Sequence, residues 1–324
     1  MTSKKLNVLF VASGNHGGLH HGTKAQMDSL AGENVRVDFI LVEGKGLKGY
    51  LANILPIKRK AKETNYDIIH AIGGHCGLLC AISLFGKRKV VSYLGSDIQK
   101  AADQKRSFVE ELIRKVMFLS SRNYSQIIVK SKRMLDSLPK KALAKVHVIP
   151  NGVDFVLFRP MGMEEARTKL NLKKDKKYIL FLGDKKLRNK NFELVENACR
   201  LVNGDSLEIL NPFPVDHSLI PFYMNAADLL ILTSFSEGSP NIIKEALACN
   251  CPIVATDVGD VAENLADIDG CFVSSFAAGD VAAKIDAVLL ANKRTNARDQ
   301  IRHLDKAAIA KKIVAVYQAA LKSK

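Results

Sequence analysis

Short apolar segments rich in β-branched residues recur along this chain of 324 residues, and stretches with helical spacing separate them. Parallel strands need a crossover connection, usually a helix, so this alternation predicts parallel sheets. We therefore predict an α/β fold of two tandem, doubly wound, Rossmann-like domains. The predicted strands are residues 6–12, 35–42, 67–72, 90–94, 127–129 and 146–149 in the first half, and residues 178–182, 206–210, 228–233, 253–256 and 271–274 in the second.

The length of the chain also favours two domains, because a single hydrophobic core usually stops growing at about 250–300 residues. The turn-forming stretch Pro150-Asn-Gly-Val-Asp154 predicts a join there, which gives domains at residues 1–152 and 153–305. Ligands of open parallel sheets bind beyond the carboxyl ends of the strands, so two such domains facing each other would form a cleft. The loops at these strand ends are therefore the first places to search for a site.

Positive charge is concentrated in the first half of the chain. The formal net charge is +15, and residues 1–152 contain 25 Lys and Arg against 11 Asp and Glu, whereas residues 153–324 contain 23 against 22. A polyanionic partner of the first half explains this asymmetry better than a solvated basic surface does.

Other features of the sequence predict a cytoplasmic protein. No apolar run reaches the ~18 residues that a membrane-spanning helix needs, and Met1–Lys5 leads into a predicted strand rather than a signal peptide. The six cysteines form no C-x-x-C pair, so we expect buried thiols in a reducing compartment.

Two loops that follow predicted strands have the composition of ligand loops. Ser13–Gly22 lacks the G-x-G-x-x-G spacing of dinucleotide sites, yet Gly17 and Gly18 would let the backbone approach a ligand; a plain flexible loop fits equally well. Gly183–Phe192 leads into a helix predicted near Asn191. Its cations are Lys185, Lys186, Arg188 and Lys190. Helix N-termini disfavour cations, so this cluster favours a bound phosphate or pyrophosphate over a solvated basic turn.

The stretch SEGSPNIIKEALACNCPIVATDVGDVAE, residues 236–263, holds two carboxylates at a defined spacing. A helix is predicted to begin near Pro240, since proline suits the first helical position. Glu237 then lies in the loop at the carboxyl end of a strand, and Glu245 lies on the helix. Backbone N–H groups at the start of that helix would be donors for a bound anion.

Glu237 and Glu245 enclose seven residues, and this E-x7-E pattern resembles the motif of the retaining nucleotide-sugar glycosyltransferases of family four, which have the GT-B fold. The resemblance covers the whole chain. The stretches that carry it are Val148-Ile-Pro-Asn-Gly-Val-Asp154 and Phe158-Arg-Pro160, similar to the family's interdomain signature, and Ala227–Ser234 and Ala255–Gly259, similar to its strands beside the motif.

The resemblance implies a hexosyltransferase-type enzyme of polysaccharide or lipopolysaccharide synthesis, with the acceptor on the first domain and the donor on the second. Glu237 would hold hydroxyls of the donor sugar, and Glu245 the ribose hydroxyls, because carboxylate oxygens accept several hydrogen bonds. Cations and amides would neutralise the leaving diphosphate. The implied donor-binding residues are Lys185, Arg188, Lys190, Gly238, Ser239, Asn241, Ile242 and Glu245.

The resemblance also implies a catalytic set of Glu237, His75 and Asp97, and a loop of His16, Gly17 and Gly18 for acceptor or phosphate. The chain departs from the family pattern at two positions. Leu94 stands where many members have a His before Gly-Ser-Asp, so either His75 assumes part of that role or the donor differs. Asp184 stands where an Arg is common, which shifts the phosphate contacts onto the neighbouring cations.

We expect no metal site and no cofactor, the nucleoside-diphosphate sugar being a substrate. The histidines of the first loop lack a Cys or carboxylate at ligand spacing, and Asp267-Ile-Asp269 resembles a metal-binding D-x-D only superficially. The alternatives are a sugar-nucleotide epimerase, a phosphorylase-like enzyme of the same fold, or a basic nucleic-acid-binding protein. Against the last, the sequence has no RRM-like aromatic strand and no zinc-finger spacing, so no nucleic acid is expected.

Two segments carry further expectations. In the resembling family the last helix crosses back to the first domain, and residues 306–324 have an apolar face for this packing. In Gly44–Glu63, an apolar face flanked by cations predicts docking on the inner face of the cytoplasmic membrane and a lipid-linked or glycolipid acceptor, unless that face packs on the domain's own sheet. The apolar residues are Leu47, Tyr50, Leu51, Ile54, Leu55 and Ile57, and the cations are Lys45, Lys48, Lys58, Arg59, Lys60 and Lys62.

Overall fold

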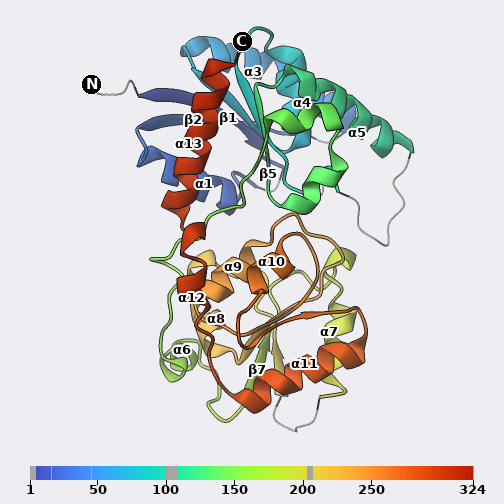
Figure 1. The fold of residues 1–324 in the computed structure, drawn as a ribbon, viewed down its shortest axis with the longest axis vertical. Coiled ribbons are helices and arrows are strands. Elements are labelled where there is room, and N and C mark those ends of the chain that lie inside the picture. Colours follow the sequence, from blue (N-terminus) through green and yellow to red (C-terminus); the bar gives the residue numbers. More distant parts are fainter. Residues whose placement is uncertain are drawn as a thin grey trace. The chain divides into compact units, whose positions relative to one another are not determined.

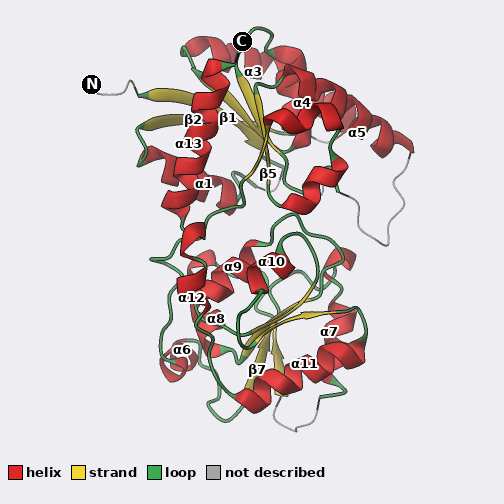
Figure 2. Ribbon diagram, in the orientation of Figure 1, coloured by secondary structure: helices red, strands yellow, loops and turns green. Residues whose placement is uncertain are grey.

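The computed structural model describes residues 5–15, 17–44, 46–95, 97–99, 108–202 and 207–323. The chain divides into two compact units. The first comprises Met1–Lys100, Gln104–Gly152 and Lys306–Lys324, and the second comprises Ala101–Asp103 and Val153–Asp305. Each unit has one parallel sheet with helices on both faces, which confirms the predicted α/β fold (Figures 1 and 2).

The first unit is built on a six-stranded parallel sheet in the order β2-β1-β3-β4-β5-β6. Its strands are β1 (Leu6–Ser13), β2 (Val35–Val42), β3 (Ile68–Ile72), β4 (Lys89–Ser92), β5 (Gln126–Val129) and β6 (Val146–Val148). One face packs against α3 (Ile54–Glu63), α4 (Gly74–Ser83) and α5 (Phe108–Ser120), and the other against α1 (His21–Ala31) and α13 (Lys306–Lys322). Two-sided burial explains why these strands are nearly continuous apolar runs.

Helix α13 returns to the first unit, as the sequence predicted. Its residues Ile309, Ile313, Val316 and Tyr317 are buried in one core with strands β1, β3, β4 and β5. The Tyr317 hydroxyl lies 2.7 Å from His70 Nδ1 on β3, and His70 Nε2 lies 2.8 Å from the Ser92 hydroxyl on β4. This buried polar contact fixes α13 on the sheet at one position.

The second unit has a five-stranded parallel sheet in the order β11-β10-β9-β7-β8. Its strands are β7 (Lys177–Leu180), β8 (Leu207–Leu210), β9 (Leu229–Leu232), β10 (Ile253–Thr256) and β11 (Cys271–Ser274). The helices are α6 (Met163–Lys169), α7 (Phe192–Cys199), α8 (Ile220–Ala226), α9 (Asn241–Ala248), α10 (Val261–Leu265), α11 (Ala278–Ala291) and α12 (Ala297–Gln300). Each of the eleven predicted strands is present, with ends that differ by at most two residues.

The segment Gly44–Glu63 forms two helices, α2 (Gly46–Ala52) and α3, and does not present a single apolar face. Asn53 separates them, because its side-chain Nδ2 donates to the carbonyls of Glu43 and Gly49, both at 2.8 Å. Ile57 is fully buried in the first unit's own core, whereas Leu55 is 63% exposed. Lys45 and the side chain of Leu47 lie outside the described residues.

All six cysteines are free. Four of them are buried, as predicted, whereas Cys199 and Cys271 are partly exposed. None of the helices in the described part of the chain combines the length and the apolar character needed to cross a membrane.

Candidate functional site

Three loops of the second unit meet at the carboxyl edge of its sheet. They follow β7, β9 and β10, and β9 lies between the other two strands in the sheet order. The first loop carries the predicted cations, the second carries Glu237, and the third carries Gly259 and Asp260. Because all strands of this sheet are parallel, residues far apart in the sequence meet here.

Side-chain and backbone hydrogen bonds join the loops after β7 and β9. Asn189 Nδ2 donates to the Ser236 carbonyl at 2.9 Å, and the Phe235 N–H donates to the Asn189 carbonyl at 2.9 Å. The Thr233 hydroxyl lies 3.0 Å from the carbonyls of both Lys190 and Asn191. The two loops therefore form one connected structure at the sheet edge.

Lys190 and Glu237 form an ion pair across these loops, with Nζ and Oε1 2.6 Å apart. Both side chains are partly buried, at 26% and 19% exposed. Partial burial strengthens the attraction relative to a fully solvated pair. The structure thus brings together the two residues that the sequence assigned to the diphosphate and to the donor sugar.

The other predicted cations lie on the turn before α7. The Lys185 ammonium lies over the Phe192 ring, 5.0 Å from its centroid, and Arg188 is exposed in a short 3-10 helix, η4 (Arg188–Lys190). Asp184 Oδ1 accepts a hydrogen bond from the Lys186 N–H at 2.9 Å and so shapes the turn. These cations are close to the start of α7, as predicted, and Arg188 is accessible to an anion.

Helix α9 begins at Asn241, and Pro240 caps it with φ −67° instead of occupying its first helical position. The first amides of a helix lack intrahelical acceptors, so a helix start such as that of α9 suits an anion. The buried Gly238 carbonyl is close to Gly259, which has φ +59°; a Cβ on Gly259 would lie 2.7 Å from that oxygen. Both the conformation and the space therefore require glycine at position 259.

A buried network supports this turn, and sequence reasoning missed it. Lys244 is fully buried, and its Nζ donates to the Ser239 hydroxyl at 2.6 Å; that hydroxyl donates to Asp260 Oδ2 at 2.7 Å. Burial lowers the pKa of Lys244, and the acid Asp260 opposes this effect. The sequence did offer one signal of this network: Lys244 follows Ile243, which lies on the buried side of α9. Lysine is almost never fully buried unless it is paired, so a lysine at this position indicates a buried polar partner.

Glu245 is largely buried, with its side chain 14% exposed, and it contacts a residue that the sequence did not indicate. Its Oε1 lies 3.6 Å from His217 Nε2, and the His217 ring meets Phe158 edge to face at 5.5 Å. The neighbouring Glu245 carboxylate raises the pKa of His217, although desolvation opposes it. His217 follows no motif in the chain, so only the tertiary fold reveals the pair.

In the first unit, His75, Leu94 and Asp97 lie at the carboxyl ends of the neighbouring strands β3 and β4. The Asp97 carboxylate accepts hydrogen bonds from the amides of Gly74 at 2.8 Å, Gly95 at 2.9 Å and Leu94 at 3.1 Å. Burial raises the pKa of Asp97, and these amides oppose the rise. Asp97 thus joins the two loops, while His75 is exposed at the start of α4, with its ring 5.4 Å from that of Tyr50.

The loop after β1 is open at its glycines. Gly17 has φ +82° and Gly18 has φ +127°, and a Cβ on either would meet no atom within 4 Å. Glycine is therefore required for the backbone conformation and not for packing. His16 lies outside the described residues, and His20 caps α1 by accepting from the Gly22 N–H at 3.2 Å. Within the described ranges, no three His, Cys, Asp or Glu residues are grouped as metal ligands would be.

Two family models match the chain. Residues 7–156 match the model "Glycosyltransferase Family 4", and residues 163–291 match the model "Glycosyl transferases group 1". Together the matches span most of both units, and the second includes every candidate residue of the β7, β9 and β10 loops.

The chain is also similar to curated glycosyltransferases. It is 28% identical over 155 residues to TuaC of Bacillus subtilis (strain 168), assigned to teichuronic acid biosynthesis, and 27% identical over 189 residues to the D-inositol 3-phosphate glycosyltransferase of Mycobacterium marinum. These matches cover 42% and 49% of this chain. The chain spans about 40% of the length of these two relatives.

Solved structures share the fold along nearly the whole chain. Sucrose-phosphate synthase from Thermosynechococcus elongatus has a TM-score of 0.82 at 18% identity, with 98% of this chain and 100% of that chain covered. Anabaena HepE in complex with UDP-glucose has a TM-score of 0.76 at 16% identity, with 97% and 100% covered. At such low identity these likenesses establish the fold.

Proposed function

Because the chain belongs to glycosyltransferase family 4 and has the GT-B fold, we propose that it transfers a sugar from a nucleoside diphosphate to an acceptor on its first unit. The observation that carries this proposal is the meeting of Glu237, Lys190 and the start of α9 at one sheet edge. We further propose that the reaction retains the configuration of the donor sugar and needs no metal ion.

The residues of this edge suit a donor of that kind. The amides of Gly238, Ser239, Asn241 and Ile242, together with Lys190 and Arg188, would hold the diphosphate, whose negative charge grows as the glycosidic bond breaks. Glu245 would accept the ribose hydroxyls, and Glu237 would accept hydroxyls of the sugar. On this proposal the donor separates the ion pair between Lys190 and Glu237, its phosphate taking the cation and its sugar the carboxylate.

The acceptor is proposed to be a glycan or a lipid-linked or glycolipid molecule, as in polysaccharide or lipopolysaccharide synthesis. The first half of the chain, with 25 Lys and Arg against 11 Asp and Glu, suits an anionic acceptor or an anionic membrane. The similar glycosyltransferases are named for teichuronic acid and D-inositol 3-phosphate, both anionic. We propose that the first unit provides His75 and the Gly17–Gly18 loop for this acceptor.

Calorimetry with UDP-glucose, UDP, GDP-sugars and ADP-sugars tests the proposal, UDP-glucose being the ligand named with the HepE structure. A ligand at 100 times its Kd should stabilise the chain by about 2.7 kcal/mol. Glu245→Ala should weaken binding by about 1.5–3 kcal/mol, the usual contribution of a hydrogen bond to a charged group. The matched control is Glu196→Ala, an exposed carboxylate on α7, which should bind like wild type.

Four results would contradict the proposal. Unchanged donor affinity in Glu245→Ala would exclude the ribose role, and loss of transfer in EDTA would exclude metal independence. Turnover of the donor that depends on inorganic phosphate, or isomerisation of its sugar without transfer, would favour a phosphorylase-like enzyme or an epimerase instead.

A further inference from the structure

The amino ends of the first unit's strands form a basic edge. All six strands are parallel, so the segments that enter them lie together at the edge opposite the loops with His75 and Gly17. Helix α13 ends there as well, since Arg88 Nε donates to the Ala320 carbonyl at 3.1 Å. The cations of the entering segments are Lys58, Arg59, Lys60 and Lys62 before β3, Lys87 and Arg88 before β4, Arg122 before β5, and Lys140, Lys141 and Lys145 before β6.

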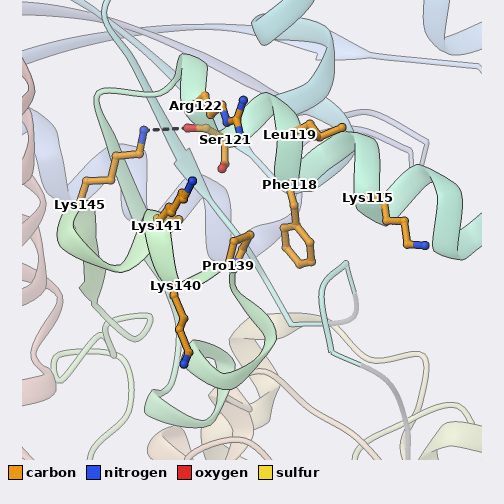
Figure 3. Close-up of a pocket in the computed structure, with 10 residues that line it drawn as sticks. Lys115, Phe118, Leu119, Ser121, Arg122, Pro139, Lys140, Lys141 and Lys145 are labelled. Atoms are coloured by element: carbon orange, nitrogen blue, oxygen red, sulfur yellow. Dashed lines mark hydrogen bonds between the residues drawn. The ribbon is translucent and has the colours of Figure 1, made fainter.

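A cavity of about 570 Å³ opens at this edge, between the end of α5 and the segments that lead into β5 and β6 (Figure 3). Phe118, Leu119, Pro139 and Ala142 give it an apolar lining. Binding sites for small molecules have volumes of about 300–1,000 Å³. The cavity is therefore large enough to hold a molecule with an apolar part.

Lys145 holds the walls of the cavity together. Its Nζ donates to the Ser121 carbonyl at 2.8 Å and to the Tyr124 carbonyl at 2.7 Å, which joins the 3-10 helix η3 (Lys140–Lys145) to the segment after α5. Burial lowers the pKa of Lys145. These bonds occupy the Lys145 ammonium in a structural contact, and they fix the walls without a ligand.

Arg122 and Lys141 are free to bind an anion. Both are exposed, and neither has an ion-pair partner among the residues that the structure describes. Figure 3 shows the Lys141 amine pointing toward Ser121 and Arg122. Two unpaired cations above an apolar cavity match an anion that carries a hydrocarbon chain.

The adjoining face of α5 is also apolar and exposed. Leu112, Val116 and Leu119 are 51%, 40% and 61% exposed, and their i, i+4, i+7 spacing places them on one stripe of the helix. An exposed apolar stripe beside cations is typical of a helix that lies in a membrane interface. Leu119 belongs to both the stripe and the cavity, so the two form one continuous surface.

We propose that this cavity binds an anionic phospholipid of a bilayer, with the lipid phosphate on Arg122 and Lys141 and part of an acyl chain against Phe118, Leu119 and Pro139. A free phosphate would leave the apolar lining unused, and a nucleic acid has no chain to fill it. The cavity is at the opposite edge of the sheet from the candidate acceptor loops, so it would anchor the first unit and would not hold the acceptor. The inference goes beyond the proposed function and does not depend on the donor site.

Flotation of the full chain with phosphatidylcholine vesicles, with or without phosphatidylglycerol, tests the proposal. Wild type should bind only the anionic vesicles. Arg122→Gln with Lys141→Gln should bind about 30-fold more weakly, because each cation near such a surface contributes about 1 kcal/mol and 1.4 kcal/mol is a factor of ten. Leu119→Gln should bind about tenfold more weakly, through the lost apolar contact.

The control pair is Lys311→Gln with Lys312→Gln, which removes the same charge from exposed positions of α13 on the opposite face of the sheet. It should bind within about threefold of wild type.

Equal losses of binding in the two pairs of variants would overturn the proposal in favour of delocalised attraction. Equal binding to neutral and anionic vesicles, or no binding to either, would also overturn it. Displacement by millimolar inorganic phosphate would identify a site for a soluble anion. Unchanged melting and UDP binding of the Arg122/Lys141 variant would show that any loss concerns the membrane alone.

Discussion

At the scale of single residues, Lys190 and Glu237 form an ion pair, although on the proposed function Lys190 contacts the diphosphate of the donor and Glu237 contacts its sugar. Lys190→Ala should lower kcat/KM by one to several orders of magnitude, on the scale of about 2–4 kcal/mol for a lost charge-stabilising donor. Glu237→Ala should lower kcat more than it raises KM, because orientation of the sugar matters in the transition state. Steady-state kinetics with Lys169→Ala, an exposed lysine on α6, gives the control; a Glu237→Ala kcat equal to wild type would rule out the sugar contact.

The buried network of Lys244, Ser239 and Asp260 has a consequence for stability. Lys244→Met leaves the Asp260 carboxylate without its cation, which typically costs about 3–5 kcal/mol in the free energy of unfolding. Adding Asp260→Asn removes the uncompensated charge and should restore part of this loss. Urea unfolding of the two single variants and the double variant measures the coupling. Additive effects would show that the residues do not act as a unit.

The residues of the site differ in how well the sequence predicted them. Glu237, Glu245 and the cations of the loop after β7 were predicted, because polar residues beside a strand end or helix start are local signals. His217 and Lys244 were not, since their partners are reached only after folding: His217 lies 3.6 Å from Glu245, and Lys244 reaches Asp260 through a hydroxyl. A sequence pattern indicates which groups lie at an edge, and the fold decides which of them pair.

At the scale of elements, the strands were predicted to within two residues because burial on both faces leaves an unbroken apolar run. The break between α2 and α3 was not predicted at Asn53. Pro56, three residues later, was the stronger local signal of a helix break. It lies instead in the first turn of α3, where its missing N–H costs little. The Asn53 side chain ends α2 by bonding to Glu43 and Gly49 carbonyls, a contact that depends on the strand before it.

The docking of α13 should depend on pH. Burial lowers the pKa of His70 to about 3, whereas an unfolded histidine titrates at about 6.5. Between these values the unfolded chain binds a proton that the folded chain does not, so stability falls as the pH falls, by up to about 1.4 kcal/mol per pH unit. Urea midpoints at pH 7, 6 and 5 should fall less steeply in His70→Gln than in wild type. His303→Gln, an exposed control, should follow wild type; identical slopes in all three would contradict a buried neutral His70.

At the scale of the whole molecule, the two units differ in how the chain builds them. Every contact described among Lys190, Glu237, Ser239, Lys244 and Asp260 lies within Val153–Asp305, which is one continuous segment. The first unit instead needs α13 from the end of the chain to cover one face of its sheet.

This difference predicts that residues 153–305 produced alone will fold and bind UDP with an affinity close to that of the full chain. Residues 1–152 produced without α13 should aggregate or melt at a lower temperature, because the face with Val8, Phe10 and Ile68 is left bare. Calorimetry on the first fragment and thermal melting of the second measure the two outcomes. A soluble fragment of residues 1–152 that melts at the temperature of the full chain's first unit would show that α13 contributes little.

The length of the first unit's strands sets the distance between the two edges of its sheet. Strand β1 has eight residues, and at about 3.3 Å per residue it separates the basic edge from the Gly17–Gly18 loop by about 26 Å. A unit held to a bilayer by Arg122, Lys141 and Leu119 at its basic edge, with the rest of α5 rising from the lipid, would therefore present its acceptor loops up to about 26 Å above the lipid phosphates. A short glycolipid would not reach them, whereas an oligosaccharide of several sugars on a lipid would. Such an enzyme would select acceptors by their length, and extend chains rather than start them.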